Sequence, residues 1–302
     1  MYKIGFSTLA FFFFILIPTI AFADLKIVAT LPTLGALARE IGGSDVSVET
    51  LANNSEDPHY VSPRPDFILK LNKADLLIYN GMELEIGWLP PIQKNARNSK
   101  VLDSGNGNFD ASKFIQPLHV PTGKIDRSQG DIHAQGNPHY LYSLPNCMAI
   151  AKGMANKMSE LDPEHAPQYQ ERLKVFLTKA EAENTYWLEK FASIPEDKKR
   201  IISYHDSMIY MTQWLGLEQK GTIEPIPGVA PSPSHVTALV SKLKSDPVSY
   251  ILQENYQPKS TSTKIGNLIQ AKLIIIVPGP DANQSYLDYV HQTMEAFFTA
   301  SK

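Results

Sequence analysis

The sequence has little cysteine and little excess charge. Its 302 residues include one cysteine, Cys147, which cannot form an intramolecular disulfide or a zinc site built from several cysteines. There are 28 lysine and arginine residues against 31 aspartate and glutamate residues, and the net charge of -3 excludes a strongly basic nucleic-acid binder. Hydrophobic residues make up 43% of the chain, which is enough for a packed core. The length corresponds to about two domains.

Long hydrophobic runs are absent except at the N-terminus. Lys3 precedes an almost wholly apolar stretch, 6–21, and the sequence A-F-A at 21–23 is a small-x-small cleavage site. Residues 1–23 are therefore predicted to be a secretory signal peptide. Because no cysteine follows the apolar run, we expect a periplasmic protein that is exported by a cleaved signal peptide and is not lipid-anchored.

Strand-like runs alternate with helical patterns over most of the chain, which is typical of an α/β fold with mostly parallel sheets. Strands are expected at 25–30, 46–51, 76–80, 200–203, 248–252 and 272–277. Helices are expected at 34–41, 65–71, 88–95, 207–215, 235–244, 259–269 and 285–299. The stretch 103–110, which is rich in glycine, asparagine and aspartate, is expected to be a loop.

Strand signals disappear in the middle of the chain. From 164 to 191 apolar residues recur at helical spacing, which predicts one helix roughly 42 Å long at about 1.5 Å per residue. The apolar stripe consists of Tyr169, Leu173, Phe176, Leu177, Ala180, Trp187, Leu188 and Phe191. We therefore expect two similar α/β lobes, 24–145 and 194–302, joined by a helical segment, 146–193.

Three of the eight histidines are candidate metal ligands. His59 and His205 follow predicted strands, and ligands of open α/β sheets bind outside the carboxyl ends of the strands. His59 and His139 each follow a proline, which stiffens the approach of the imidazole and lowers the entropy lost on binding. A single histidine at a strand end is more often an ordinary polar loop residue. The four histidines expected to have only such ordinary roles are His119, His165, His235 and His291.

Several motifs together resemble the zinc and manganese solute-binding proteins of ABC importers. They are Asp57-Pro58-His59, Gly136-Asn137-Pro138-His139, Tyr204-His205-Asp206, the N-G-M-E-L-E stretch at 80–85, and Gln253-Glu254 followed by Pro258-Lys259-Ser260. The resemblance covers residues 24–302. It implies two α/β lobes joined by one long rigid helix, with a single metal ion in the cleft between them and two ligands from each lobe.

The resemblance also implies which residues hold the metal. It gives His59 and His139 as ligands from the first lobe and His205 as a ligand from the second. Manganese-binding members tend to have a carboxylate where this chain has His205. Three neutral imidazoles suit Zn²⁺, whereas oxygen ligands suit Mn²⁺. Zn²⁺ is therefore expected as the transported ion, and Mn²⁺ is the less favoured alternative.

The fourth ligand is predicted to be Asp281. Three histidines leave a tetrahedral Zn²⁺ one ligand short, and a carboxylate would lower the charge of the site. The resemblance implies an acidic residue in the loop after the last strand, and Asp281 is the carboxylate in that loop. Asp281 could instead cap the last helix, and Glu254 is the rival ligand. Asp206 is expected to support His205 from outside the ligand set.

His133 is predicted to have an accessory role in metal recruitment. Zinc-binding members often carry a histidine-rich acidic loop before the second ligand, whereas the corresponding stretch here, 122–135, holds only His133.

The function implied by the resemblance is high-affinity capture of a divalent metal ion and its delivery to an ABC permease in the inner membrane. A zinc-dependent hydrolase is one alternative, because catalytic zinc also uses histidines with a carboxylate, but the sequence has no H-E-x-x-H motif. A metal-binding adhesin is the other. The protein is expected to be a monomer, to bind no nucleic acid and not to be an enzyme.

Overall fold

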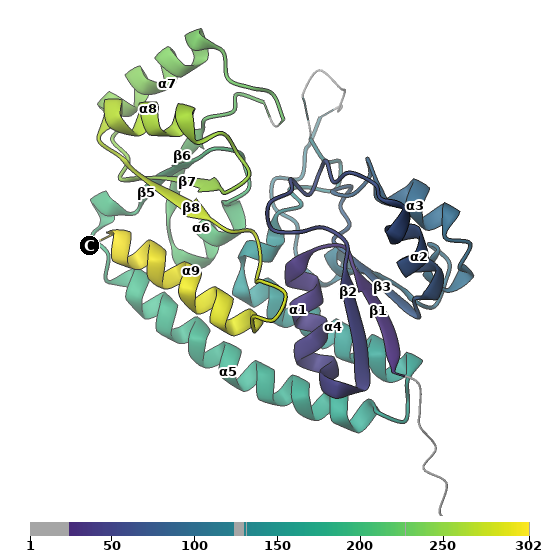
Figure 1. The fold of residues 1–302 in the computed structure, drawn as a ribbon. Helices are drawn as coiled ribbons and strands as arrows, with labels where there is room; N and C mark the ends of the chain where they lie inside the picture. Colours follow the sequence, from purple (N-terminus) through teal and green to yellow (C-terminus); the bar gives the residue numbers. More distant parts are fainter. Residues whose placement is uncertain (1–23, 124–129, 131, 227, 302) are drawn as a thin grey trace, which may run out of the picture.

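Two parallel four-stranded sheets organise the chain (Figure 1), and the computed structural model describes residues 24–123, 130, 132–226 and 228–301. The first sheet has the order β2-β1-β3-β4, formed by Val46–Thr50, Leu25–Ala29, Leu76–Tyr79 and Asn108–Asp110. The second has the order β6-β5-β7-β8, formed by Glu218–Thr222, Arg200–Ser203, Tyr250–Glu254 and Lys272–Ile276. The predicted α/β class with two similar lobes is confirmed. The predicted signal peptide, 1–23, lies outside the described residues.

The sequence patterns miss two of these strands. β4 was expected to be part of a loop, and β6, with the sequence E-Q-K-G-T, has no hydrophobic alternation. Both are edge strands of their sheets, where short length and polar side chains are common because only one side pairs with a neighbour. Their absence from the prediction follows from this lack of an apolar pattern.

Every predicted helix has a counterpart among the described residues, α1 and α7 begin two residues earlier than expected, and the predicted helical segment 146–193 consists of two helices, α4 and α5. Their bounds are α1 Pro32–Gly42, α2 Pro65–Lys73, α3 Leu89–Asn95, α4 Leu144–Leu161, α5 Ala166–Ala192, α6 Ile209–Leu215, α7 Pro233–Ser245, α8 Lys259–Ile269 and α9 Tyr286–Ser301. α1, α2 and α7 begin at a proline, whose fixed φ and missing N–H suit the first helical position. None of the described helices is long and apolar enough to cross a membrane.

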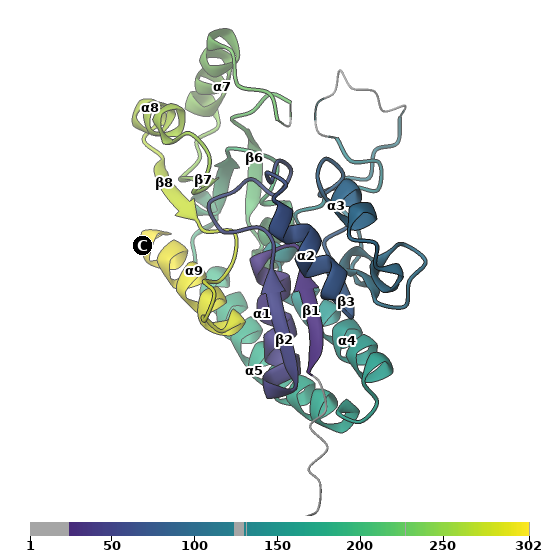
Figure 2. The ribbon, with the colours of Figure 1, turned by 45° about the vertical axis from the view of Figure 1, so that its right-hand side comes forward.

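The long helix α5 connects the two lobes. It has 27 residues, or roughly 40 Å at about 1.5 Å per residue, and runs beneath both sheets with α9 alongside it (Figure 1 and Figure 2). Most of the predicted apolar stripe is buried, but Leu188 is 39% exposed. One continuous apolar cluster extends from β1 through α5 to α9. The two lobes therefore share part of their core through this helix.

Candidate metal centre

Three buried histidines converge between the lobes. Ligand atoms of His59, His139 and His205 all lie within 4.8 Å of one another. The Nε2 atoms of His139 and His205 are 3.1 Å apart, and two imidazole nitrogens on a tetrahedral Zn²⁺ would be about 3.3 Å apart for Zn–N bonds of 2.0–2.1 Å. No other cluster of this kind exists among the described residues. The three histidines named from the sequence are therefore brought together by the fold.

His59 lies in the loop that follows β2. The backbone N–H of His59 donates to Oδ1 of Asp57 at 3.0 Å, and Nδ1 of the ring lies 2.9 Å from the same oxygen. The indole N–H of Trp88 donates to the carbonyl of Pro58 at 2.9 Å, which anchors this loop to the core of the first lobe. With Nδ1 held by Asp57, Nε2 is left for a metal ion. Burial would raise the pKa of Asp57, but the hydrogen bonds and charge of His59 lower the pKa below its usual value.

His139 precedes a short helical turn and is fixed from behind. Its backbone N–H donates to Oδ1 of Asn137 at 3.0 Å, and the side-chain amide of Asn80 donates to the carbonyl of Pro138 at 3.0 Å. Burial, followed by the charges of the neighbouring histidines, lowers the pKa of His139 well below the usual 6.5. A neutral imidazole is the form that binds a metal ion.

The N-G-M-E-L-E stretch builds the turn that holds Asn80. The carboxylate of Glu85 accepts hydrogen bonds from the Thr30 hydroxyl at 2.7 Å and from the backbone N–H groups of Asn80 at 2.7 Å and Gly81 at 3.1 Å. Gly81 has a φ of +79°, and a Cβ there would collide with the carboxylate of Asp110. Burial raises the pKa of Glu85 to about 7 against the opposing effect of these hydrogen bonds. The motif therefore acts on the metal site indirectly, by positioning the segment that carries His139.

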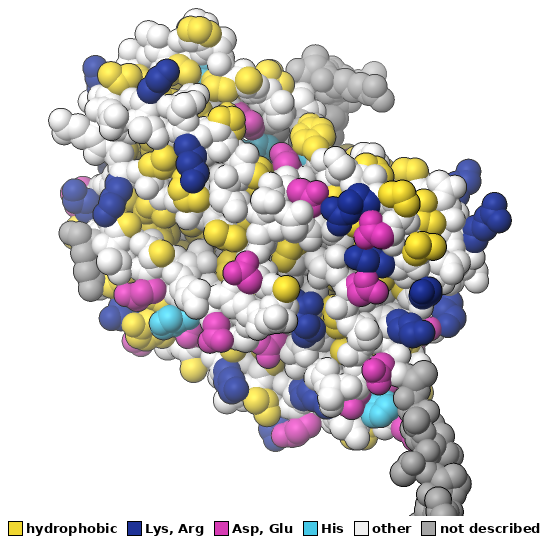
Figure 3. Space-filling view, in the orientation of Figure 1, with side chains coloured by type: hydrophobic (Ala, Val, Ile, Leu, Met, Phe, Trp, Pro, Cys, Tyr) yellow, Lys and Arg dark blue, Asp and Glu magenta, His cyan; other side chains and the backbone are white. Residues whose placement is uncertain are grey.

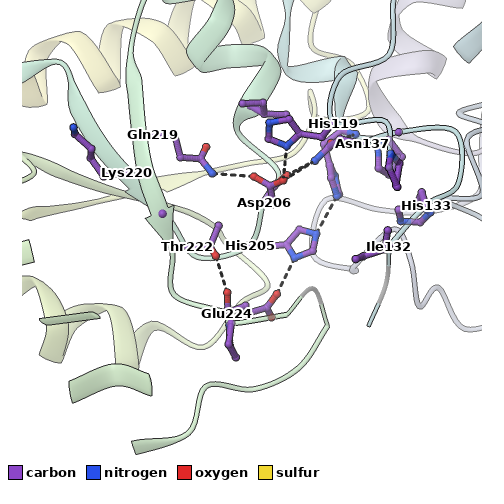
Figure 4. A pocket seen from close by; sticks show the side chains of 17 residues that line it. His119, Ile132, His133, Asn137, His205, Asp206, Gln219, Lys220, Thr222 and Glu224 are labelled. Atoms are coloured by element: carbon purple, nitrogen blue, oxygen red, sulfur yellow. Dashed lines mark hydrogen bonds and ion pairs between the residues drawn. The ribbon is translucent and has the colours of Figure 1, made fainter. Parts of the chain in front are cut away.

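His205 follows β5 and is held by a carboxylate that sequence reasoning missed. Nδ1 of His205 lies 2.7 Å from Oε2 of Glu224, which follows β6 (Figure 4). Both side chains are largely buried, at 10% and 14% exposure. Burial would lower the pKa of His205, but the hydrogen bond to Glu224 and the charges of Glu254 and Glu224 raise it above 6.5. The one signal for Glu224 is its position just after β6, and the sequence pattern does not predict that strand.

Asp206 does not support His205 in the way the sequence suggested, because Glu224 has that role. The carboxylate of Asp206 instead accepts hydrogen bonds from Gln219 at 2.9 Å and from Asn137 at 3.3 Å, and it pairs with His119 at 3.1 Å. His119, expected to be an ordinary loop residue, thus contributes to a contact between the lobes.

Asp281 is not part of the cluster that the three histidines form. Its side chain is exposed, and its backbone N–H donates to Gln284 at 3.1 Å. The loop before it is fixed against the first lobe, because the amide of Asn54 donates to the carbonyl of Pro280 at 3.0 Å. The role of Asp281 as a ligand therefore stays a prediction that this geometry does not support.

The rival carboxylate, Glu254, is fully buried at the end of β7 but is not part of the histidine cluster. One of its oxygens accepts a hydrogen bond from the Tyr142 hydroxyl at 3.3 Å, and the other has no hydrogen-bond partner among the described residues. Burial raises the pKa of Glu254, although the Ser207 hydroxyl and the charge of His205 oppose this shift. Glu254 is therefore a buried acidic group near His205 whose oxygens are not among the ligand atoms that lie within 4.8 Å of one another.

His133 lies beside the cluster at the wall of a cavity. Its Nε2 is 3.3 Å from Nε2 of His59, and the two rings are stacked. A cavity of about 570 Å³ opens next to His133, His139 and His205 (Figure 4). Figure 3 shows histidine and acidic side chains together in the hollow between the lobes. This placement agrees with the accessory role predicted for His133 but does not test it.

Two α/β lobes around a buried histidine cluster, joined by one long helix, define a metal-binding solute-binding protein. The family model described as ZnuA, zinc-uptake complex component A, periplasmic, matches residues 27–300, so the chain belongs to this family. A crystal structure of ZnuA has a TM-score of 0.77 and 22% identity, and the match covers 93% of this chain and 100% of that one.

Curated relatives agree on the class of transport and differ in the metal they name. The chain is 27% identical to the metal ABC transporter substrate-binding lipoprotein SsaB of Streptococcus sanguinis over 268 residues, which cover 83% of this chain and 80% of the relative. It is 26% identical to the manganese ABC transporter substrate-binding lipoprotein scaA of Streptococcus gordonii over 284 residues, or 87% and 85% of the two chains. The protein is thus the metal-binding component of an ABC importer, which captures a metal ion and docks with the permease, and it is not an enzyme.

These relatives correct one prediction. Both are named lipoproteins of streptococci, which contradicts the expectation of a periplasmic protein without a lipid anchor. That expectation rested on residues 1–23 and on the missing cysteine after the apolar run, and it is not kept.

Proposed function

We propose that this protein is a monomer that captures Zn²⁺ with His59, His139 and His205 and delivers it to its ABC permease. One observation carries the proposal: among the described residues, the cluster between the lobes consists of three imidazoles and includes no carboxylate. Nitrogen ligands favour Zn²⁺, whereas carboxylate and water oxygens favour Mn²⁺. The name of scaA refers to manganese, but that name describes a relative that is 26% identical to this chain.

The charges around the cluster support a divalent cation. Asp57 and Glu224 hold the Nδ1 atoms of two of the three histidines, and Glu254 is buried nearby. Three neutral imidazoles leave the charge of Zn²⁺ uncompensated, so these surrounding carboxylates lower the cost of burying it. We propose that a water molecule takes the fourth position, because neither Asp281 nor Glu254 lies in the cluster.

The arrangement of the carboxylates also argues against a hydrolase. Asp206, a possible general base in that alternative, accepts hydrogen bonds from Gln219 and Asn137 and pairs with His119. Glu254 is buried in the second lobe. A general base has to reach the proton of a metal-bound water. Asp206 is already engaged by three other groups, and no carboxylate oxygen of the described residues belongs to the cluster.

Competition between the two metals tests the proposal. The metal-free protein is titrated with Zn²⁺ against a chromogenic chelator, first alone and then with about a hundredfold excess of Mn²⁺. The proposal predicts one Zn²⁺ per chain and no displacement by Mn²⁺. Displacement of Zn²⁺ by Mn²⁺ would contradict the zinc assignment while leaving the family membership intact.

A further inference from the structure

Every polar group of Asn137 makes a hydrogen bond, and its side-chain N–H₂ and its backbone carbonyl bond to the second lobe. Its Oδ1 accepts the backbone N–H of His139 at 3.0 Å. Its side-chain amide donates to the backbone carbonyl of Asp206 at 2.5 Å and approaches the carboxylate of that residue at 3.3 Å (Figure 4). One side chain therefore contacts the segment of a ligand in the first lobe and the residue next to His205 in the second.

The backbone of Asn137 is held from both lobes as well. Its N–H donates to the carbonyl of Leu118 at 2.8 Å within the first lobe. Its carbonyl accepts the hydroxyl of Tyr210, a buried residue of α6 in the second lobe, at 2.8 Å. The same hydroxyl accepts the N–H of Leu118 at 2.9 Å. Tyr210 thus binds two neighbouring backbone segments of the first lobe at once.

Asp206 is held by side chains from both lobes. Gln219 of β6 donates to one carboxylate oxygen at 2.9 Å, and His119 of the first lobe pairs with the other at 3.1 Å. Asp206 is therefore oriented toward Asn137 by groups from both lobes. A hydrogen bond to an ionised carboxylate is stronger than one between neutral groups.

We propose that Asn137, Asp206 and Tyr210 form a positioning junction that sets His139 against His205 across the cleft and thereby slows the release of Zn²⁺. The inference rests on the proposed function, because it takes these two histidines as zinc ligands. Their Nε2 atoms are 3.1 Å apart although they belong to different lobes. A shared ion needs this separation to be maintained, and the junction joins the two backbone segments next to the ligands.

Zinc release from single and double variants tests the junction. Asn137→Ala removes the side-chain link, and Tyr210→Phe removes one hydroxyl while keeping the ring, which packs edge-on against Tyr140. Mutating a residue that orients a metal ligand without touching the metal typically lowers metal affinity by about 10–100-fold. We expect each variant to raise the zinc dissociation rate by about tenfold, and the double variant to show less than the product, because both act on the same segment.

Tyr250→Phe is the matched control. Tyr250 is also buried, and its hydroxyl donates to the backbone carbonyl of Ser301 at 3.1 Å, near the C-terminus. It should leave the release rate unchanged. The melting temperature of each metal-free variant is measured in parallel.

The outcomes separate the two proposals. Faster release in the junction variants, with a melting temperature no lower than that of Tyr250→Phe, supports the inference. Zinc release at the wild-type rate overturns the inference. Faster release accompanied by a melting temperature below that of Tyr250→Phe also overturns it, because general destabilisation would then explain the rate. So does a double variant whose release rate increases by the full product of the two single effects. If the wild-type protein binds no Zn²⁺, the proposed function fails first, and the inference fails with it.

Discussion

Replacing Glu224 with glutamine tests how the second lobe presents its ligand. The carboxylate lies 2.7 Å from Nδ1 of His205, and both side chains are largely buried. It holds the proton on Nδ1, so that Nε2 stays available, and it increases the basicity of the ring. Removing such a carboxylate typically costs about 10–100-fold in metal affinity, or about 1.4–2.8 kcal/mol. We therefore expect Glu224→Gln to weaken zinc binding by this factor at pH 8.

The pH dependence of the same variant gives a second test. Glu224 contributes to raising the pKa of His205 above 6.5. In the wild-type protein, protons therefore begin to compete with zinc for His205 at a pH above 6.5, and the competition increases as the pH falls. Without the charge of Glu224 the pKa of His205 falls, and proton competition begins at a lower pH. The loss of affinity caused by Glu224→Gln should therefore be larger at pH 8 than at pH 6.

Chelator competition at the two pH values measures both effects, and Glu218→Gln is the control. Glu218 lies on β6, its side chain is 57% exposed, and its ion pairs with Arg200 and Lys220 are on the surface. The control should bind zinc as the wild type does. Equal affinities of Glu224→Gln and Glu218→Gln, or a loss that grows toward acid pH, would refute the role given to Glu224.

Five other substitutions test the rest of the site. Alanine at His59, His139 or His205 should each weaken zinc binding by about 10²–10³-fold in calorimetric titration, if roughly 10–16 kcal/mol of binding is shared among four ligands, while the circular dichroism spectrum stays unchanged; wild-type affinity in any one would remove that residue from the ligand set. His133→Ala should slow zinc loading in stopped-flow mixing and keep most of the affinity, and a loss as large as that of His139→Ala would make it a ligand. Glu85→Gln should destabilise the metal-free protein in urea by about 1–3 kcal/mol, because one amide oxygen cannot accept three hydrogen bonds, and an unchanged midpoint would contradict this. Because burial raises the pKa of Glu85 from 4.5 to about 7, its contribution to wild-type stability should decline as the pH rises through this range, and the glutamine variant should lack that decline.

The elements with a strong apolar pattern could be predicted from the sequence. The long helix α5 was expected within two residues of its observed bounds, because its buried face repeats at helical spacing. The edge strands β4 and β6 could not be, since β4 has only three residues and β6 is polar without hydrophobic alternation. Leu188 fitted the apolar stripe but is exposed, because the position of a helix against its neighbours decides which side chains at the margin of a stripe are covered.

The histidine cluster could be named in advance because proline–histidine motifs and strand ends mark it along the chain. The groups that orient it could not. Glu224 follows an unpredicted strand, and Asn137 acts through contacts to residues 69 and 73 positions away. Asp281 was chosen for its place in the loop after the last strand, but that loop is bound to the first lobe and leaves its side chain exposed. Such relations depend on how the two lobes pack, which local sequence patterns do not report.

X-ray absorption at the zinc edge tests the central claim most directly. The protein is loaded with one Zn²⁺ per chain, and the spectra of the wild type and of His139→Ala are compared. The account predicts four-coordinate zinc with three histidine nitrogens at about 2.0–2.1 Å and one oxygen, and the loss of one histidine contribution in the variant. A six-coordinate ion surrounded mainly by oxygen, or the same histidine count in both proteins, would contradict it.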